Sequence, residues 1–236
     1  MKNINSCLTC INENCFIKSC SPSWIQRIKG EKTEAKYKKG QQIIFEGTSV
    51  ESINFIYSGK VKVFKNGYSD KHQIVKFSKS GNILGHRGIN STISPISASA
   101  LDDSVICSFP RHVFLDLLQN NQDLTFNLLM FFADELYNSE VRERNMAHMN
   151  VREKTADTLC YLIKVYGADK YKTLNVCLSR QDIADFAGTT KQQVSKTLSD
   201  FKREGIIDLD VKNILILNEQ KLHAQTLVHI ESSYKY

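Results

Sequence analysis

The spacing of hydrophobic residues changes twice along this chain of 236 residues. Between Tyr37 and Phe109, short apolar runs that alternate with polar residues are separated by glycines such as Gly40, Gly59 and Gly81. Such runs are typical of antiparallel strands in a barrel, a sandwich or a roll. We therefore expect a small all-β unit in the first half of the chain.

A helical spacing follows, in a stretch without glycine or proline that reaches Met149. The segment Phe126–Phe132 is apolar around almost the whole helix, which is more than a helix lying on one surface requires. A helix that packs on its own chain and also on a second copy explains this composition, although an ordinary core helix is the alternative. We expect a dimerisation helix over residues 121–149, with Phe131 and Phe132 among its contacts.

The pattern changes again at Val151, where a helix begins that Gly167 would end. Two short helices and two strand-like runs follow at Ser179–Ala187, Thr190–Glu204, Ile206–Leu209 and Ile214–Leu217. A helix, a helix-turn-helix and a hairpin in this order predict a winged helix over residues 150–236.

The two short helices carry a series of local signals. Ser179 followed by Asp182 is a capping-box pattern, with Asp where Glu is usual. Ala184 is small where two helices must cross, and Gly188 permits the positive φ of a sharp turn. Thr190 can then cap the second helix. Together these residues predict a helix-turn-helix.

The second of these helices has an apolar face and a polar face. Val194, Leu198 and Phe201 share the apolar one, so polar side chains face away from the core. Any one of them could simply be solvated, but an apolar back with a polar front is what a reader of the major groove needs. The expected DNA-contacting residues are Arg180, Thr190, Lys191, Gln192, Ser195, Lys196, Ser199 and Lys202.

Composition excludes several classes of protein. The chain is 42% hydrophobic and 24% charged. Its net charge of +6 is too small for a protein that binds nucleic acid through an extended polybasic surface. No apolar run approaches the roughly 18 residues of a membrane span, and the first residues form no signal-peptide core, so we expect a cytoplasmic protein without a membrane partner. No nucleophile elbow, P-loop or HExxH motif occurs, so we do not expect an enzyme.

Four short phrases in the β-rich half, Lys39-Gly40-Gln41, Phe45-Glu46-Gly47, Ser58-Gly59-Lys60-Val61 and Gly81-x-x-Leu84-Gly85, resemble the β-roll of the catabolite activator and fumarate–nitrate regulator (CRP/FNR) family. The resemblance extends over nearly the whole chain. It implies an α+β protein: a Cys-rich segment at 1–20, an antiparallel β-roll sensor domain that resembles cyclic-nucleotide-binding domains at 21–120, a dimerisation helix at 121–149 and a winged helix at 150–236. It also implies a homodimeric transcription regulator on palindromic double-stranded DNA, with RNA polymerase as a further partner.

The second helix of the predicted helix-turn-helix, which would contact the bases, departs from the family pattern. Two positions that usually hold Glu and Arg hold Gln192 and Lys196 here, whereas Ser195 keeps the serine of the FNR branch. Glu accepts a hydrogen bond from cytosine, while Gln suits adenine. DNA binding is expected to be retained, but the target sequence of the family is not.

Cyclic AMP is not the expected ligand. The family binds its ribose with Gly-Glu-Leu and its phosphate with an Arg-Ser pair, whereas this chain has Gly85-His86-Arg87 and Ser94-Pro95-Ile96-Ser97. Without that arginine the phosphate loses a bidentate, charge-assisted contact. Arg87 stands where the family has an apolar residue.

Seven cysteines offer another candidate effector site. Three N-terminal cysteines and a fourth in a later strand resemble the oxygen-sensing FNR branch, which implies that Cys7, Cys10, Cys15 and Cys107 hold a [4Fe–4S] cluster. This chain has one residue fewer than that branch between the second and third cysteines, and Cys20 is extra. Cys20 is therefore an alternative ligand.

Other chemistry stays open at these cysteines. They could bind Zn²⁺ tetrahedrally or act as metal-free redox sensors, and Cys107 alone could be a buried small hydrophobe. A small organic effector is a further alternative, and haem ligation by His72 or His86 is less favoured. The N-terminal segment has few apolar residues, so we expect Fe–S bonds to fix it to the sensor domain. In another class of function, the chain would be a ligand-gated subunit that regulates a protein partner.

Overall fold

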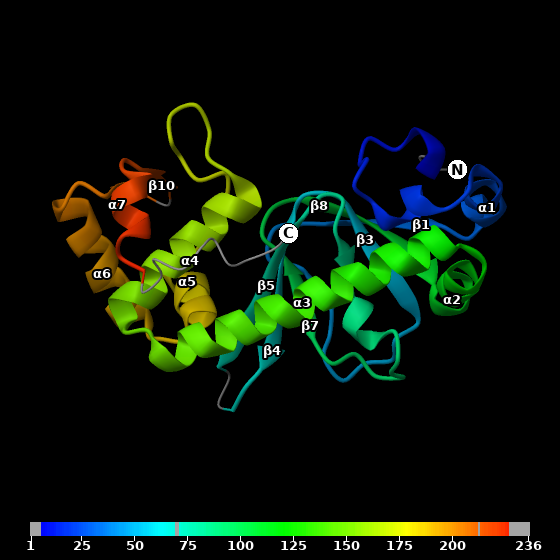
Figure 1. The fold of residues 1–236 in the computed structure, drawn as a ribbon, viewed down its shortest axis with the longest axis horizontal. Coiled ribbons are helices and arrows are strands. Elements are labelled where there is room, and N and C mark those ends of the chain that lie inside the picture. The colour runs from blue at the N-terminus through cyan, green and yellow to red at the C-terminus, as the bar shows by residue number, and fades with distance from the viewer. Residues whose placement is uncertain (1–5, 69–70, 212, 227–236) are drawn as a thin grey trace. The chain divides into compact units, whose positions relative to one another are not determined.

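The computed structural model describes residues 6–68, 71–211 and 213–226, in two compact units (Figure 1). The first unit contains residues up to 66 together with 78–133, and the second contains 67–77 together with the chain from 134 onward. The division therefore falls inside one strand and inside the longest helix. Among the described residues, none of the helices has the length and apolarity needed to cross a membrane.

Two antiparallel sheets form the β-rich part of the chain, which confirms the predicted β-roll. The strand orders are β1-β8-β3-β6 and β2-β7-β4-β5. In the first sheet, Ile53 of β3 lies opposite Phe109 of β8, and both are buried. The strands are β1 Thr33–Tyr37, β2 Gln42–Ile44, β3 Ser52–Ser58, β4 Lys60–Asn66, β5 His72–Lys79, β6 Ile83–Leu84, β7 Ser97–Ala100 and β8 Ser104–Pro110.

The N-terminal segment packs on the first unit through apolar side chains, which corrects one expectation. Ile17, Ile25 and Ile28 are each at most 5% exposed and belong to the hydrophobic core of this unit together with Phe114. The segment from Ile17 onward is therefore docked without any metal. Its elements are η1 Cys7–Thr9, η2 Phe16–Ser19, α1 Pro22–Arg27 and η3 Ile28–Gly30.

Two helices, α2 Arg111–Asn120 and α3 Gln122–His148, follow the strands, and α3 confirms the predicted long helix (Figure 1). Leu124 and Leu128 of α3 are buried. The large apolar side chains that α3 leaves exposed are Phe126, Leu129, Met130, Leu136 and Tyr137.

Phe131 and Phe132 of α3 are half-buried within the first unit. The rings of Phe131 and Phe16 meet edge-on at 5.2 Å, and His86 contacts both phenylalanines. Substituting these two residues would therefore damage the sensor unit itself. The exposed residues of α3 are the better probes of a dimer contact.

The C-terminal elements confirm the predicted winged helix. Helix α4 packs against both helices of the helix-turn-helix. Two short strands, β9 and β10, form an antiparallel pair, and β9 contacts α6. The elements are α4 Val151–Tyr166, α5 Arg180–Ala187, α6 Lys191–Arg203, β9 Ile207–Asp210, β10 Asn213–Ile216 and α7 Glu219–His223. The short turn η4 His86–Gly88 belongs to the first unit.

Candidate functional site

Local hydrogen bonds cap the starts of both helices of the helix-turn-helix, α5 and α6. Ser179 Oγ accepts from Asp182 N at 3.0 Å, and the Asp182 carboxylate accepts from Ser179 N at 3.0 Å. Thr190 forms the equivalent box with Gln193 at the start of α6. Gly188 has φ +63°, and a Cβ there would collide with the end of the Met146 side chain. The predicted caps and glycine turn are confirmed.

Helix α6 presents the expected polar face to solvent. Val194, Leu198 and Phe201 are fully buried on the opposite side, so the helix cannot rotate without exposing them. The side chains of Thr190, Lys191, Gln192, Lys196, Ser199 and Lys202 are exposed, and that of Ser195 is half-buried. Ser195 Oγ donates to Lys191 O at 2.8 Å, and Ser199 Oγ donates to Ser195 O at 2.9 Å.

Two of the predicted DNA contacts have particular surroundings. Lys202 Nζ lies 2.7 Å from Asp208 Oδ1 of β9, and this exposed ion pair lowers the pKa of the Asp208 carboxyl. A DNA phosphate would have to compete with that carboxylate for Lys202. Arg180 is half-buried at the start of α5, and burial lowers the pKa of its guanidinium.

Sequence reasoning missed the arginine that supports α6 from behind. The Arg152 guanidinium lies 4.5 Å from the centre of the Phe201 ring, and its Nη1 donates to Glu204 Oε1 at 3.1 Å. Its Nε also donates to Gln225 Oε1 at 2.9 Å. Nothing in the spacing distinguishes Arg152 from the other charged residues at the start of α4.

A second arginine ties α5 to α3 and β5 within the second unit. The Arg142 guanidinium donates to Val75 O at 2.8 Å, Ile74 O at 2.6 Å and Phe186 O at 2.7 Å. It also lies 3.9 Å from the centre of the Phe186 ring. Gln73 Nε2 adds a bond to Asp185 O at 2.6 Å. The residues that precede the helix-turn-helix turn are therefore held by side chains from two other elements.

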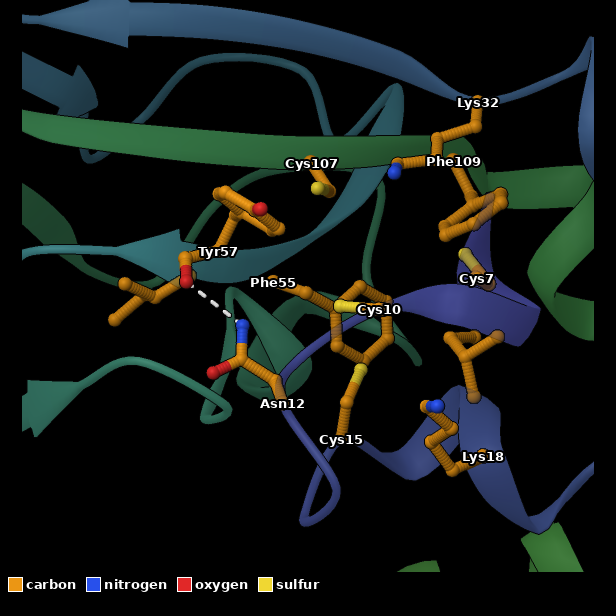
Figure 2. A pocket seen from close by; sticks show the side chains of 12 residues that line it. Cys7, Cys10, Asn12, Cys15, Lys18, Lys32, Phe55, Tyr57, Cys107 and Phe109 are labelled. Atoms are coloured by element: carbon orange, nitrogen blue, oxygen red, sulfur yellow. Dashed lines mark hydrogen bonds between the residues drawn. The ribbon is translucent and has the colours of Figure 1, made fainter. Parts of the chain in front are cut away.

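The first unit contains a cavity, partly open to solvent, whose wall includes four cysteines (Figure 2). They are Cys7, Cys10, Cys15 and Cys107. The three N-terminal cysteines come from η1 and the loop after it, and Cys107 comes from β8. Sequence-distant thiols are thus brought to one site.

Hydrogen bonding places the loop that carries Cys10 and Cys15. Asn12 Nδ2 donates to Tyr57 O of β3 at 2.7 Å, a bond that Figure 2 shows beside the cavity. Lys18 Nζ donates to Leu8 O at 3.2 Å. The loop therefore lies against the sheet from which Cys107 comes.

Burial favours the thiol form of Cys7, Cys15 and Cys107. It raises the pKa of Cys15 to about 12 and that of Cys107 to about 11. It also raises the pKa of Cys7. A ligand that binds thiolates must displace these protons.

The remaining cysteines lie elsewhere. Cys20 is 4% exposed and packs in the hydrophobic core of the first unit, and it is not part of the cavity wall. Burial raises its pKa to about 11. Cys160 lies on α4, and Cys177 lies just before α5.

Side chains in the segment that the family resemblance places at a phosphate site bond within the chain. Ser97 Oγ accepts from Glu46 N at 3.0 Å and from Gln42 Nε2 at 3.3 Å. Ser94 Oγ donates to Ile96 O at 2.8 Å. His86 is 3% exposed in the first unit, whereas His72 is exposed and belongs to the second.

Comparisons with known proteins match both halves of the chain. The family description "Cyclic nucleotide-binding domain" fits residues 34–121, and "Crp-like helix-turn-helix domain" fits residues 153–225. Electron transport regulator A of Shewanella oneidensis is 25% identical over 187 residues, which are 78% of this chain and 75% of that protein. The fumarate and nitrate reduction regulatory protein of Vibrio cholerae is 25% identical over 186 residues, which are 78% and 74% of the two chains. The structure of FixK2 from Bradyrhizobium japonicum has the same fold, with a TM-score of 0.74 at 24% identity over 84% of this chain and 98% of that one.

Proposed function

Because the chain belongs to the Crp/Fnr family of DNA-binding transcription regulators and is related to anaerobic regulators, we propose that it senses oxygen or redox state through an iron–sulfur cluster. The proposed ligands are Cys7, Cys10, Cys15 and Cys107. One observation carries this proposal: four thiols from two distant parts of the sequence line one cavity.

The cavity wall supplies four cysteines, which is the donor set that a [4Fe–4S] cluster takes. Tetrahedral Zn²⁺ with Zn–S bonds of 2.3 Å needs sulfurs about 3.8 Å apart. Within residues 6–68, 71–211 and 213–226, no group of three or more His, Cys, Asp or Glu side chains is placed to hold one ion. In a four-iron cluster each thiolate binds a different iron, so its ligands stand farther apart. The position of Cys20 in the core supports Cys7, Cys10 and Cys15 as the N-terminal ligands.

The cluster would supply oxygen-labile iron–thiolate bonds, and the chain's own contacts would transmit their loss. Ile17 is buried in the core, whereas Cys7 and Cys15 are only partly buried against it, so cluster loss should release the part from Cys7 to Cys15 first. Phe16 follows Cys15 directly and contacts Phe131 on α3. Displacement of Cys15 therefore reaches the helix that we propose as the dimer contact. The response requires that the cluster bind the two states with different affinity.

On the DNA side, we propose that a homodimer places one α6 helix in each half of a palindromic site. Gln192, Ser195, Lys196 and Ser199 would face base edges, and the other polar residues, Arg180, Thr190, Lys191 and Lys202, would contact phosphates or groove walls. RNA polymerase is the proposed further partner. A gel-shift assay separates this function from that of a subunit that regulates a protein partner.

The cluster proposal is tested by anaerobic reconstitution followed by iron and sulfide assay. Cys107→Ser should lose the cluster, whereas Cys20→Ser and the control Cys160→Ser should retain it. If the anaerobic parent protein contains no iron, or if Cys107→Ser holds as much iron as the parent, the proposal is wrong. Zinc, thiol redox chemistry or an organic effector would then explain the cavity.

A further inference from the structure

The wall of the cysteine cavity contains a buried lysine. The Lys32 side chain is 3% exposed, and its Nζ lies 2.8 Å from Glu34 Oε1. Its ammonium group points into the cavity near Cys107 (Figure 2). Glu34 Oε1 also lies 3.9 Å from Cys107 Sγ. An ion pair and a proposed ligand sulfur are therefore in direct contact.

A buried ammonium is unfavourable unless nearby negative charge compensates it. Glu34 supplies a negative charge to Lys32. The same carboxylate oxygen also lies beside the Cys107 sulfur. Lys32 and Cys7 line the same cavity. Lys32 therefore provides a buried positive charge in the wall that also contains Cys7 and Cys107.

We propose that Lys32 is a positioning residue that balances the charge of the thiolate-bound cluster, with Glu34 holding its ammonium group toward Cys107 and Cys7. This inference rests on the proposed cluster function and deepens it. Four thiolates around a [4Fe–4S]²⁺ core give a net charge of 2−, and an N–H donor beside a ligand sulfur stabilises that charge.

The reduction potential of the cluster reports this interaction. One electron from dithionite takes the thiolate-bound cluster from 2− to 3− without making or breaking an Fe–S bond. A nearby positive charge favours the more negative state and a nearby negative charge disfavours it. Lys32→Met should therefore lower the midpoint potential, and Glu34→Gln should raise it. Opposite shifts from two adjacent residues are not expected of damage to the fold.

The experiment is an anaerobic potentiometric titration of reconstituted protein, after iron and sulfide have been counted in each variant. Lys36→Met is the matched control, because Lys36 is an exposed lysine on β1, the strand that Lys32 directly precedes, and it should keep the parent potential. Lys32→Arg should also keep it, since the positive charge and an N–H donor remain. Should Lys32→Met fail to load iron, the Glu34→Gln titration decides alone: a raised potential supports the inference and an unchanged one overturns it.

The possible failures are distinguishable. If the parent binds no iron, the proposed function is wrong and this inference goes with it. If the parent binds its cluster but Lys32→Met has the potential of Lys36→Met, the cluster proposal stands and the role of Lys32 is refuted.

Discussion

The contact of Arg142 with α5 predicts that this one side chain stabilises the helix-turn-helix. The carbonyl of Phe186 is one of the last in α5, where no amide of the helix is available to it. Arg142 satisfies this carbonyl and two carbonyls of β5 at once. Arg142→Ala leaves all three without that donor and exposes the face of the Phe186 ring.

The size of the effect follows from these contacts. A hydrogen bond from a charged donor contributes about 1.5–3 kcal/mol, and a partly desolvated cation–π contact about 1–2 kcal/mol. Contributions from one side chain are not additive, and Arg142 is half-buried, so water replaces part of the loss. We expect Arg142→Ala to lower the free energy of unfolding of the second unit by about 3–5 kcal/mol. The melting temperature should fall by roughly 6–20 °C.

Differential scanning calorimetry and amide hydrogen exchange measure this prediction. Exchange should accelerate at Gly188 and Thr189, whose amides bond to Ala184 O at the end of α5. Arg144→Ala is the control, because Arg144 is exposed and its guanidinium donates to the neighbouring Asn145; the substitution should cost less than about 0.5 kcal/mol. Equal melting temperatures for the two variants would refute the reasoning.

Four further results are expected. Leu129→Glu places a charge on the exposed apolar face of α3 and should give monomers in sedimentation; a persisting dimer contradicts the proposed contact. Gln192→Ala should weaken DNA binding by about 1–3 kcal/mol per half-site and relax the preference at one base pair, measured by binding to a set of operator variants. An unchanged base preference would show that Gln192 does not contact a base. Asp208→Asn should free Lys202 to contact a DNA phosphate, so binding to all sequences should strengthen alike. The slope of log K against log salt concentration should steepen by about one, and an unchanged slope excludes a phosphate contact by Lys202. In metal-free protein at pH 8, Cys15 should react with iodoacetamide at roughly a thousandth of the rate of an unhindered cysteine, and the rate should still rise with pH above 9, because its pKa is about 12; a rate that levels off below pH 10 contradicts this.

Features encoded by neighbouring residues could be predicted from the sequence. The caps at Ser179 and Thr190 and the turn at Gly188 depend on contacts within a few positions, so the residues themselves determine them. The apolar face of α6 is likewise a matter of spacing along one helix. The cysteine set came from a family resemblance, and the cavity now gives it a location.

Long-range contacts were not predictable in this way. Lys32 looks like one of many exposed charges before a strand, and only the fold places it in a cavity wall. Arg142 lies in a charged run that resembles a solvated helix face, yet it reaches three carbonyls on two other elements. Phe131 and Phe132 were expected at the partner because composition cannot tell which face of a helix its own chain covers.

The hydrogen bonds of Ser195 and Ser199 within α6 limit which DNA bases these two side chains could recognise. Each hydroxyl hydrogen is already committed to a carbonyl one turn back, at Lys191 and at Ser195, so each oxygen has only lone pairs to offer. While these bonds persist, Ser195 and Ser199 can accept from the amino groups of adenine or cytosine but cannot donate to the O6 and N7 acceptors of guanine. Because the rotamers are fixed before the encounter, little rotational freedom is lost when the helix enters the groove. Guanine is then left to Lys196, the lysine that we propose to face base edges, and the amide of Gln192 can pair with either kind of edge.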